Sequence, residues 1–408
     1  MKYSKSFPKT QKQAPSGAES INHKLLVRAG FIDQLMSGSW TLLPLGFRVV
    51  SKINDIIREE LNKTGAQELL MPLLHPKEIW NETGRWDSAK DIMYQLKKDN
   101  KEFGLSFTHE EIVVDLIRKY QLSPKDYPVK VYHFSTKFRH ELRAKSGILR
   151  GREFMMKDLY SAHLTEEDMY LYYNEVIETY KKIFKRLGME VIVTEASGGV
   201  FTDKNSHEFQ VLSPIGEDLI YYCECGKCDF AQNQEIFKGK EGDKCEGCDC
   251  KIVSGKSIEV GNIFPLGTMY AQKMGAFYTD STGAKKPLWL ASYGIGPTRV
   301  LGTLVELFHD DKGIVWPENV APYKVHLVSI NSNEKADKVY EALESQGIEV
   351  LYDDREVTTG QKFADADLIG LPVRLIVSVK NEDKIELKKR NQESSELLTL
   401  EEVLKKLK

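Results

Sequence analysis

Apolar residues recur at helical spacing in two stretches near the start of the chain. Between residues 23 and 36 they lie near helical spacing and stop at a Gly/Ser stretch, which predicts a helix. A second predicted helix runs from Gly46 to Asn62, because its apolar positions form an i, i+3, i+4, i+7 stripe. Gly65 ends this helix, and residues 68–72 predict a strand. This pair fits a subunit interface, although taken alone it fits ordinary core packing better.

The middle of the chain has short strand-like segments around one long helix. The predicted strands cover residues 105–107, 129–138, 152–158 and 191–194. The helix opens at Thr165, with Asp168 in its first turn as a partial capping box, and Gly188 ends it. Because strands and helices do not alternate strictly here, we expect an antiparallel sheet flanked by helices, which is an α+β fold.

In the last part of the chain the order of the predicted elements changes. A helix follows Arg299, and Pro317 and Pro322 then mark a linker. Beyond it, predicted strands (325–330, 348–352 and 373–379) alternate with predicted helices (334–346, 360–368 and 398–407), which indicates a small α/β domain. We therefore expect a large domain over residues 1–312, a linker over 313–323 and a small domain over 324–408.

Composition limits the class of protein. At 408 residues the chain is too long for one ordinary core, so two or three domains are expected. A formal net charge of -3 gives no overall attraction to nucleic acid, so any contact with RNA must come from local basic patches. No apolar run approaches the roughly 18 residues of a membrane helix, and the N-terminal segment lacks the apolar stretch of a secretory signal. We expect a soluble, cytoplasmic protein with no membrane partner.

All six cysteines lie between residues 223 and 250, inside an insert that we assign to residues 221–256. Two Cys-x-x-Cys pairs, separated by 16 residues, have the spacing of a structural zinc site. Four thiolates leave no open position on the ion, so a catalytic metal is not expected. The expected ligands of Zn²⁺ are Cys225, Cys228, Cys245 and Cys248, with Cys223 and Cys250 as alternatives. Unliganded thiols are the competing interpretation.

A predicted hairpin in the middle of the chain combines charge with an aromatic ring. Arg139 and Glu141 share one face, because residues i and i+2 of a strand point to the same side. Arg150 and Arg152 bound the start of the return strand, and Phe154 shares the face of Arg152. One hairpin can thus offer a phosphate clamp, a carboxylate and an aromatic face to one nucleotide. The competing interpretation is an exposed hairpin held by salt bridges.

A second arginine motif reads Ser292-Tyr-Gly-Ile-Gly-Pro-Thr-Arg299. Gly294 and Gly296 permit close approach of the backbone to a ligand, and Arg299 projects from the first turn of a helix. A Gly-x-Gly pair alone is weak evidence. Two arginine motifs in a nearly neutral chain, however, favour a polyphosphate site over a salt-bridged hairpin.

These segments resemble the motifs of a known family. Residues 46–72, 138–158 and 291–306 are similar to motifs 1, 2 and 3 of class II aminoacyl-tRNA synthetases. The closer resemblance is to prolyl-tRNA synthetases of the bacterial type, and it covers nearly the whole chain. The segments that carry it are Phe107-Thr-His-Glu-Glu111, Arg150-Gly-Arg-Glu-Phe154, Ser206-His-Glu-Phe209, Ile258-Glu-Val-Gly-Asn-Ile-Phe-Pro-Leu-Gly267 and Ala291-Ser-Tyr-Gly-Ile-Gly296.

The resemblance implies an enzyme that joins L-proline to tRNA(Pro) at the expense of ATP. Arg139 and Arg299 are then the catalytic residues: Arg139 holds the α-phosphate and the carboxyl end of proline, and Arg299 holds the γ-phosphate. The other implied ATP-binding residues are Glu141, Arg150, Phe154, Glu259, Asn262 and Gly296. Phe154 would stack on adenine, with Glu141 near its amino group. Glu259 and Asn262 would lie near the nucleotide ribose, with Mg²⁺ bridging phosphates, and family members often have histidine in place of Asn262.

The resemblance also assigns a proline site and a tRNA site. The proline site would comprise Thr108, Glu110, Arg139 and His207, and a buried carboxylate at Glu110 could accept an N–H of prolinium. Residues 347–370 resemble the anticodon-binding domain of the family. Its candidate base contacts are Asp354, Arg355, Lys362 and Asp365, for which surface salt bridges are an equal alternative.

Two further implications concern assembly and editing. A homodimer is expected to form through the region that resembles motif 1. The interval 220–256 is too short for the editing domain found in many bacterial relatives, so hydrolysis of alanyl-tRNA in cis is not expected.

Two alternatives stay open. One is a class II synthetase of a sister specificity such as threonine, although those enzymes hold a catalytic zinc in the active site and the cysteines here lie outside the ATP motifs. The other is a synthetase-like paralogue that binds RNA or regulates without catalysis, although such proteins tend to lose the phosphate-binding arginines. A zinc-ribbon module for nucleic acid would explain residues 223–250 and nothing else.

Overall fold

In the computed structural model, the described residues are 1–142, 144–199, 201–226 and 228–408. They form two compact units. The first unit comprises Met1–Leu35, Trp40–Ile53 and Leu301–Lys408, and the second comprises Met36–Ser39 and Asn54–Val300. Arg143 and Lys227, which belong to the predicted hairpin and zinc motifs, lie outside the described residues, as does Val200. The domain limits expected at residues 312 and 324 stay predictions.

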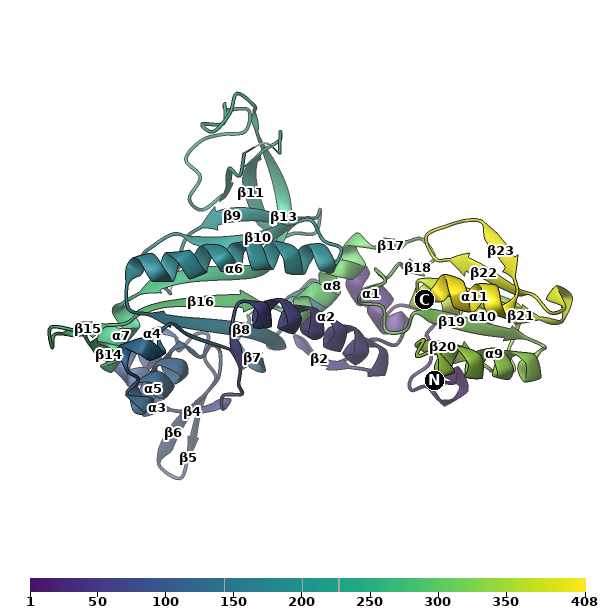
Figure 1. Ribbon diagram of the computed structural model, residues 1–408, viewed down its shortest axis with the longest axis horizontal. Helices are drawn as coiled ribbons and strands as arrows, with labels where there is room; N and C mark the ends of the chain where they lie inside the picture. The colour runs from purple at the N-terminus through teal and green to yellow at the C-terminus, as the bar shows by residue number, and fades with distance from the viewer. Residues whose placement is uncertain (143, 200, 227) are drawn as a thin grey trace. The chain divides into compact units, whose positions relative to one another are not determined.

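A nine-stranded sheet forms the centre of the second unit (Figure 1), with the strand order β10-β9-β12-β11-β13-β16-β8-β7-β3. Neighbouring strands are antiparallel, except that β3 is parallel to β7 and β12 is parallel to β9. The bounds are β3 Gln67–Glu68, β7 Val129–Phe138, β8 Glu153–His163, β9 Ile192–Ala196, β10 Ser206–Leu212, β11 Asp218–Cys223, β12 Ala231–Asn233, β13 Ile252–Gly267 and β16 Trp289–Ile295. The expected α+β class with an antiparallel sheet is confirmed.

Helix α6 (Glu166–Arg186) covers one face of this sheet (Figure 1). Thr165 caps it by accepting a hydrogen bond from the backbone N–H of Asp168 at 3.2 Å, as the partial capping box predicts. Tyr172 and Tyr173 on the buried side of α6 pack on Tyr293 of β16, with ring centroids 5.8 and 6.0 Å apart. The face against α6 is therefore a closed aromatic core.

The opposite face of the sheet is covered at one end by short helices. These are α3 (Lys77–Thr83), α4 (Arg85–Ser88), α5 (Glu110–Tyr120) and α7 (Met269–Met274). Their apolar core, which includes Trp80, Phe107 and Tyr270, packs on Tyr160 of β8 and Leu290 of β16. A small sheet of β4 (Leu74–Pro76), β6 (Lys101–Leu105) and β5 (Gln95–Lys98) adjoins them. These helices leave the rest of this face of the sheet uncovered.

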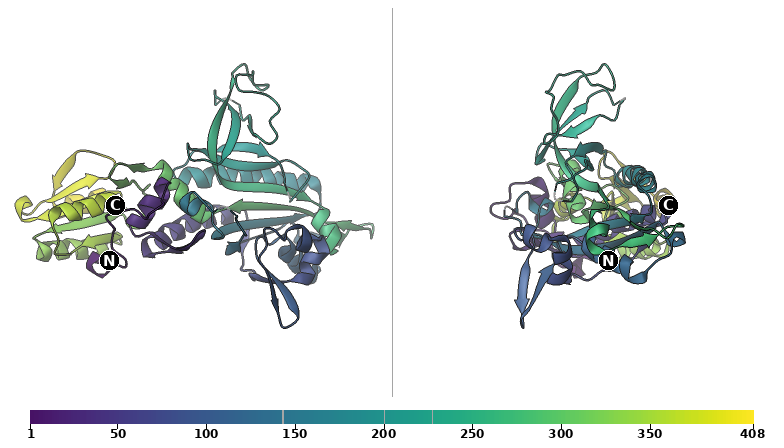
Figure 2. Two further views of the ribbon diagram at one scale, coloured as in Figure 1. Left: turned by 180° about the vertical axis from the view of Figure 1, so that it is seen from behind. Right: turned by 90° about the vertical axis from the view of Figure 1, so that its left-hand side faces the viewer.

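Strand β11 and the first half of β13 extend beyond the rest of the sheet (Figure 2). The loops at their end carry the cysteines, whose side chains form a small cluster with Ile252. A hairpin of β14 (Phe277–Thr279) and β15 (Lys285–Pro287) is also part of the second unit.

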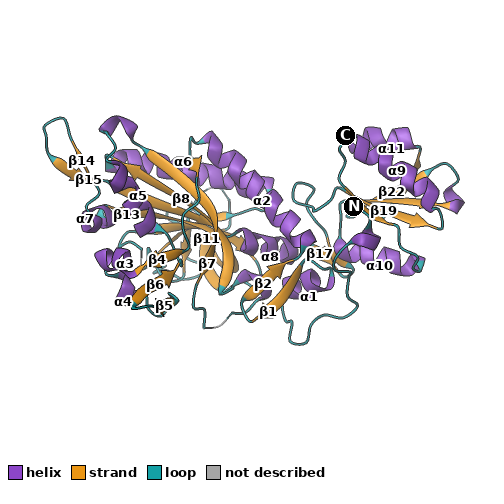
Figure 3. Ribbon diagram, turned by 90° about the horizontal axis from the view of Figure 1, so that it is seen from below, coloured by secondary structure: helices purple, strands orange, loops and turns teal. Residues whose placement is uncertain are grey.

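The first unit contains a five-stranded sheet with the order β20-β19-β21-β22-β23. Strands β19 (Val325–Ile330), β20 (Val350–Asp353) and β21 (Val373–Ser378) are parallel, while β22 (Ile385–Lys389) and β23 (Ser395–Leu398) are antiparallel. Helices α9 (Asn333–Ser345) and α11 (Leu400–Leu407) pack on one face, and α10 (Thr359–Ile369) lies on the other (Figure 3). The predicted α/β alternation is confirmed.

The remaining elements complete the chain. They are α1 (Ile21–Arg28), β1 (Ile32–Met36), β2 (Ser39–Leu42), α2 (Pro44–Lys63), α8 (Pro297–Leu307), β17 (His309–Asp310), β18 (Gly313–Ile314) and the 3₁₀ turns η1 (Tyr3–Lys5), η2 (Pro124–Asp126), η3 (Gly147–Leu149) and η4 (Val379–Asn381). Within the described residues, no helix is long and apolar enough to cross a membrane.

The prediction of a single helix over residues 23–36 is wrong. Helix α1 ends at Arg28, Gly30 has a φ of +75°, and β1 follows from Ile32. A glycine in the left-handed region commonly ends a helix. The apolar run after it is so short that it fits the spacing of a helix and of a strand equally well. Two predicted strands are also misplaced: 68–72 is reduced to β3, and 105–107 ends at Leu105 of β6.

Candidate active site

The predicted hairpin forms one wall of a pocket on the open face of the nine-stranded sheet. Strands β7 and β8 pair with Lys137 opposite Phe154, so residues just beyond β7 lie near the start of β8. The guanidinium carbon of Arg139 lies 5.4 Å from the centre of the Phe154 ring. Arg139 Nε also donates a hydrogen bond to the carbonyl of Phe107 at 3.3 Å. Burial, followed by the nearby Arg299, lowers the pKa of Arg139.

Strands β13 and β16 form the floor of the same pocket, with Asn262 opposite Gly294. A side chain at Gly294 would bring its Cβ within 2.6 Å of Met156 Cε and 2.8 Å of Asn262 Oδ1, so the ends of both side chains would have to move. Asn262 Nδ2 donates to Glu259 Oε1 at 2.7 Å. The floor of the pocket therefore carries the amide of Asn262 and the carboxylate of Glu259, and Gly294 adds no side chain above them.

Arg299 enters the pocket from the first turn of α8. Its Nη1 lies 3.1 Å from Glu259 Oε2 and donates to the Glu259 carbonyl at 2.9 Å, and its Nε donates to the Leu149 carbonyl at 3.0 Å. Helix and hairpin thus hold the second predicted arginine over the same floor as the first.

Two adjoining hollows of about 70 and 310 Å³ form this pocket. Both are lined by Arg139, Glu141, Arg150, Glu259 and Arg299, and the first is also lined by Phe154, Asn262 and Gly296. Every residue expected to bind ATP is therefore brought to one place. Segments distant in sequence converge here because the hairpin, β13 and β16 are neighbours in one sheet.

Arg150 links two carboxylates at the rim of the pocket. Its Nε lies 2.8 Å from Glu141 Oε2 and its Nη1 lies 2.5 Å from Glu217 Oε2. These hydrogen bonds, first that with Glu141, raise the pKa of Arg150. The competing interpretation was an exposed hairpin held by salt bridges. A salt bridge is present, but its residues line the pocket.

The Thr108-x-Glu110 segment lies in a buried ionic cluster. Thr108 Oγ1 donates to Glu110 Oε2 at 2.5 Å, and Arg85 Nη1 lies 3.1 Å from both Glu110 and Glu111. Arg85 also donates to the Tyr270 hydroxyl at 3.0 Å. The side chains of Arg85, Glu110 and Glu111 are only 8, 3 and 0% exposed. Burial raises the pKa of Glu111, although the charge of Arg85 opposes this shift.

Sequence reasoning missed Arg85. The residue stands in a polar stretch with no motif, and only the packing of α4 against α5 and α7 reveals its role. Its guanidinium lies 4.9 Å from the ring of Phe107 and 5.3 Å from that of Phe201, so aromatic faces enclose the cluster.

A second buried cluster adjoins the Thr108-x-Glu110 segment. The carboxylate of Asp158 forms an ion pair with Lys137 and lies 3.1 Å from His133 Nε2. The rings of His109 and His133 are in edge contact, with centroids 4.5 Å apart. Ligand atoms of His109, His133 and Asp158 lie within 4.8 Å of one another, but Lys137 already lies against the same carboxylate oxygen. Because Lys137 already pairs with the Asp158 carboxylate, no metal ion is needed to neutralise this carboxylate.

His207 is not brought to the pocket, contrary to expectation. It lies on β10 opposite Ile263, and its Nδ1 is 2.9 Å from the hydroxyl of Tyr173 on α6. Side chains alternate along a strand, so Glu208, opposite Asn262, takes the pocket side instead. The face of a strand residue depends on its register, which a motif does not specify.

Glu208 is a carboxylate that sequence reasoning missed. Its Oε2 accepts hydrogen bonds from Gln210 at 2.8 Å and from Asn233 at 3.1 Å, and Gln210 also donates to Asp218 at 3.0 Å. Burial, and then the charge of Glu259, raises the pKa of Glu208 to about 8. It lies in the segment Ser206-His-Glu-Phe209 that carries the family resemblance, but no role was predicted for it.

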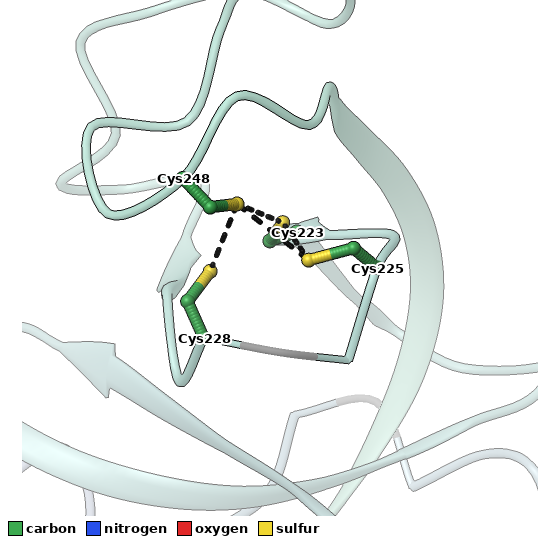
Figure 4. A group of neighbouring side chains, drawn as sticks. All are labelled: Cys223, Cys225, Cys228 and Cys248. Carbon is green, nitrogen blue, oxygen red and sulfur yellow. Dashed lines mark hydrogen bonds between the residues drawn. The ribbon is translucent and has the colours of Figure 1, made fainter.

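The cysteines of the insert gather in one cluster (Figure 4). The sulfur atoms of Cys223, Cys225, Cys228 and Cys248 all lie within 4.8 Å of one another, with the nearest pairs 3.2 to 3.6 Å apart. Zn–S bonds of about 2.3 Å in a tetrahedron set sulfurs at similar separations, so the donor set fits a closed zinc site. Cys245 Sγ lies 3.4 Å from Cys228 Sγ, and its thiol also interacts with those of Cys248 and Cys223. The geometry thus groups Cys223 with three of the four expected ligands.

The four candidate tRNA contacts lie in the first unit, around α10. Arg355 and Lys362 line an open hollow of about 710 Å³ at the ends of β19 and β20. Asp354 and Asp365 lie beside it, and Asp365 Oδ2 accepts a hydrogen bond from Arg355 at 2.8 Å. Lys362 is 4% exposed and donates to the carbonyl of Ser329 at 2.7 Å. The salt-bridge interpretation therefore holds for Asp365, while two cations face the hollow.

Comparison with known proteins agrees with this geometry. Residues 94–308 match the family model "tRNA synthetase class II core domain (G, H, P, S and T)", and residues 324–408 match the model "Anticodon binding domain". The chain is 40% identical to the proline–tRNA ligase of Wolbachia pipientis wMel over 420 residues, which covers 99% of each protein. It is 38% identical to that of Agrobacterium fabrum over 441 residues, covering 100% of this chain and 99% of the relative.

A longer relative also aligns along its full length. The proline–tRNA ligase of Dehalococcoides mccartyi is 32% identical over 561 residues, covering 100% of this chain and 98% of the relative. Since this chain has 408 residues, that relative contains a large segment without a counterpart here.

A solved structure has the same fold. The prolyl-tRNA synthetase of Cryptosporidium parvum, in a complex with halofuginone and AMPPNP, superposes with a TM-score of 0.77 at 17% identity, covering 94% of this chain and 75% of that chain. Two matching domain models, full-length relatives and a common fold lead to one conclusion: the chain belongs to the prolyl-tRNA synthetase family of class II aminoacyl-tRNA synthetases.

Proposed function

We infer that this chain charges tRNA(Pro) with L-proline in two steps, through a prolyl-adenylate made from ATP. The observation that carries this inference is a single pocket lined by Arg139 and Arg299, next to a buried, negatively charged cluster around Glu110. Membership of the family supports the same activity. A threonine enzyme and a non-catalytic paralogue are not favoured.

We propose that the pocket binds ATP in a bent form. Arg139 holds the α-phosphate and Arg299 the γ-phosphate, because a planar guanidinium suits phosphate oxygens. The ring of Phe154 supplies a face for adenine. Glu141 is bonded to Arg150 on one side, which leaves lone pairs of its carboxylate for the adenine amino group. Glycine at 296 keeps the floor near Arg299 open.

Glu259 and Asn262 offer a carboxylate and an amide oxygen, the ligands that Mg²⁺ prefers. When bound, Mg²⁺ neutralises phosphate charge during the reaction. Both side chains now bond to other groups in the pocket, so binding of the ion would redirect those bonds.

We propose that proline binds against Glu110. Glu110 and Glu111 share one guanidinium, that of Arg85, so two buried carboxylates face one directly bonded cation. A buried unpaired charge is costly, and the ammonium of proline neutralises it. Thr108 orients the Glu110 carboxylate, while Arg139 holds the carboxylate of the amino acid. The rings of Phe107 and Phe201 suit the apolar side of pyrrolidine.

The reaction needs no nucleophilic side chain. A carboxylate oxygen of proline attacks the α-phosphorus, the bond to the bridging oxygen breaks, and pyrophosphate leaves. The terminal ribose hydroxyl of the tRNA then attacks the carbonyl carbon, and AMP leaves with the electron pair of the anhydride bond. Arg139 and Arg299 contribute by positioning and by stabilising charge that develops on the phosphate oxygens.

We further propose a structural Zn²⁺ in the insert, held by Cys223, Cys225, Cys228 and Cys248. The proximity of their sulfur atoms supports this set, and Cys245, 3.4 Å from Cys228, is the alternative ligand that the sequence spacing favours. A homodimer is proposed through the segment that resembles motif 1, and the exposed side chains of Phe47 and Leu70, at 56 and 78%, support it. We also propose that the chain works in the cytoplasm and does not edit alanyl-tRNA.

The first experiment is amino-acid-dependent ATP–pyrophosphate exchange on purified protein, with proline, alanine, threonine and no amino acid. Exchange driven mainly by proline is the expected result. Exchange with threonine alone would move the chain to a sister specificity, and no exchange in folded, zinc-replete protein would favour a non-catalytic role in RNA binding.

A further inference from the structure

The N-terminal segment lies along the edge of the five-stranded sheet of the first unit. The backbone N–H of Tyr352 on β20 donates to the Met1 carbonyl at 2.9 Å, and Lys2 forms a parallel bridge with Tyr352. Lys2 Nζ also pairs with Asp337 of α9 at 2.8 Å. The segment therefore extends the sheet by one short strand and is tied to the neighbouring helix.

Two hydroxyl residues of this segment bind two of the candidate tRNA contacts. Ser4 donates to the Asp354 carboxylate twice, from its backbone N–H at 2.8 Å and from its Oγ at 2.6 Å. Thr10 Oγ1 donates to Asp365 Oδ1 at 2.7 Å. These carboxylates are thus occupied by the chain itself, which fixes their orientation.

Tyr3 covers the guanidinium of Arg355. The side chain of Tyr3 is 1% exposed, and its ring centre lies 4.2 Å from the guanidinium carbon of Arg355. Such stacking is attractive because the ring face carries negative charge density. The Tyr3 hydroxyl accepts a hydrogen bond from the backbone N–H of Thr10 at 3.2 Å, which holds the ring in place.

Carboxylates hold the edge of the same guanidinium. Arg355 Nε and Nη2 donate to the two oxygens of Asp353 at 2.8 and 2.7 Å, and Nη2 also donates to Asp365 at 2.8 Å. Within the described chain these contacts use Nε and Nη2, which leaves Nη1 for a ligand. Arg355 lines the hollow at the ends of β19 and β20 together with Lys362.

We propose that residues 2–10 are part of the anticodon-binding site, and that Tyr3 is the positioning residue that orients Arg355 toward a base of the tRNA. This inference rests on the proposed function. An arginine held on its face and on one edge has lost most of its side-chain freedom before the ligand arrives, so binding costs less conformational entropy. Its free N–H groups then suit the acceptor atoms of an unpaired base edge.

The test compares Tyr3→Leu, which removes the ring but keeps an apolar side chain, with Tyr3→Phe, which keeps the ring. Charging with proline is measured on a tRNA(Pro) transcript and on the same transcript with its three anticodon bases replaced. Tyr3→Leu is expected to lower kcat/KM on the native transcript about tenfold, mainly through KM. On the replaced transcript kcat/KM should change little, so the preference between the two shrinks. Tyr3→Phe should retain the preference of the unmodified protein.

Proline-dependent ATP–pyrophosphate exchange and thermal unfolding are measured on the same preparations. The exchange should be unchanged in Tyr3→Leu, since this chemistry belongs to the second unit, while thermal unfolding checks that the variant is folded despite the loss of a buried ring. If Tyr3→Leu does not fold, Ser4→Ala on the exposed side of the segment replaces it, with a smaller loss of the same preference expected. The inference is overturned if the preference survives both variants, or if charging improves, which would indicate a blocking segment. Failure of the unmodified protein to charge either transcript would instead reject the proposed function.

Discussion

Arg139 is the side chain through which the two halves of the active site meet. It stacks near Phe154 at the nucleotide pocket and bonds to the carbonyl of Phe107, one residue before the Thr108-x-Glu110 segment. Arg299 bonds to Glu259 and to the carbonyl of Leu149, both of which line the proposed nucleotide pocket. The two arginines should therefore differ in what their loss does to each substrate.

Replacement of Arg139 by alanine should abolish most adenylation. Loss of one charge-stabilising donor costs roughly 10²–10³ in kcat, and Arg139 would also orient both substrates. Proline-dependent ATP–pyrophosphate exchange measures the effect, with KM determined for each substrate.

Glu110→Gln is the matched control for this prediction, because it keeps the shape of the side chain and removes its charge. It should raise the KM for proline strongly and the KM for ATP little. Equal changes in both KM values would contradict a proline site at Glu110.

His75 gives the second unit a pH-dependent stability. Burial lowers its pKa to about 4, although the hydrogen bond of Nε2 to the Pro72 carbonyl at 2.7 Å opposes this shift. The unfolded chain, with a pKa near 6.5, binds the proton more tightly than the folded one. The stability that neutral His75 contributes is therefore present above about pH 6.5 and is lost as pH falls toward 4.

His75→Gln should make unfolding stability depend less on pH in this window, because glutamine retains a donor for Pro72 and does not titrate. Urea unfolding at pH 7.5, 6 and 5 compares the two proteins. Stability curves that run parallel across these pH values would contradict the assignment. His109, whose pKa is also lowered mostly by burial, contributes a pH dependence of the same sign to both proteins, so only the difference between the two curves reports on His75.

The insert between β11 and β13 is an element that a metal ion should stabilise. Its apolar core is small, being little more than Cys223, Cys245 and Ile252 with partly buried neighbours. A domain segment with so little core needs a cross-link or a metal to hold its loops. Removal of zinc should therefore loosen residues 221–256 first.

Single cysteine variants distinguish the two ligand sets. Cys223→Ser should abolish stoichiometric zinc and destabilise the insert, whereas Cys245→Ser should retain the metal if the four clustered thiols hold it. Elemental analysis and protease sensitivity of the insert provide the measurements, with Cys250→Ser as the matched control. If Cys223→Ser keeps zinc and Cys245→Ser loses it, the ligands are instead the four cysteines that the sequence spacing predicts.

Elements also explain which predictions succeeded. Long periodic segments such as α2 and α6, and strands β7 and β19, were predicted nearly to the residue, because burial of one face fixes the period. Residues 23–36 failed because Gly30 divides two short runs that either period can fit. His207 failed for a different reason, since the facing side of β10 follows from pairing with β13 and not from the motif.

For the molecule as a whole, chain length sets a limit on editing. The relative from Dehalococcoides mccartyi aligns over 561 residues, whereas the described residues of the insert here, 221–226 and 228–256, form short strand segments and the cysteine loops. The purified protein should therefore leave alanyl-tRNA(Pro) intact over the time in which it charges tRNA with proline. Deacylation of labelled alanyl-tRNA measures this, and turnover above the spontaneous rate would contradict it.

The sequence by itself determined the family, the two sheet-containing regions, and the residues of the nucleotide pocket. These features depend on local signals: hydrophobic period, turn residues, and motifs whose chemistry is specific. The sequence could not predict that Arg85 and Glu208 lie at the site, or that Tyr3 stacks on Arg355. Each of these depends on contacts between segments distant in sequence, and the energy of a buried charge depends on which partners the fold brings to it. Only the tertiary structure decided which face of β10 meets the pocket and which thiols meet one another, because the first follows from strand register and the second from the folding of the loops between β11 and β13.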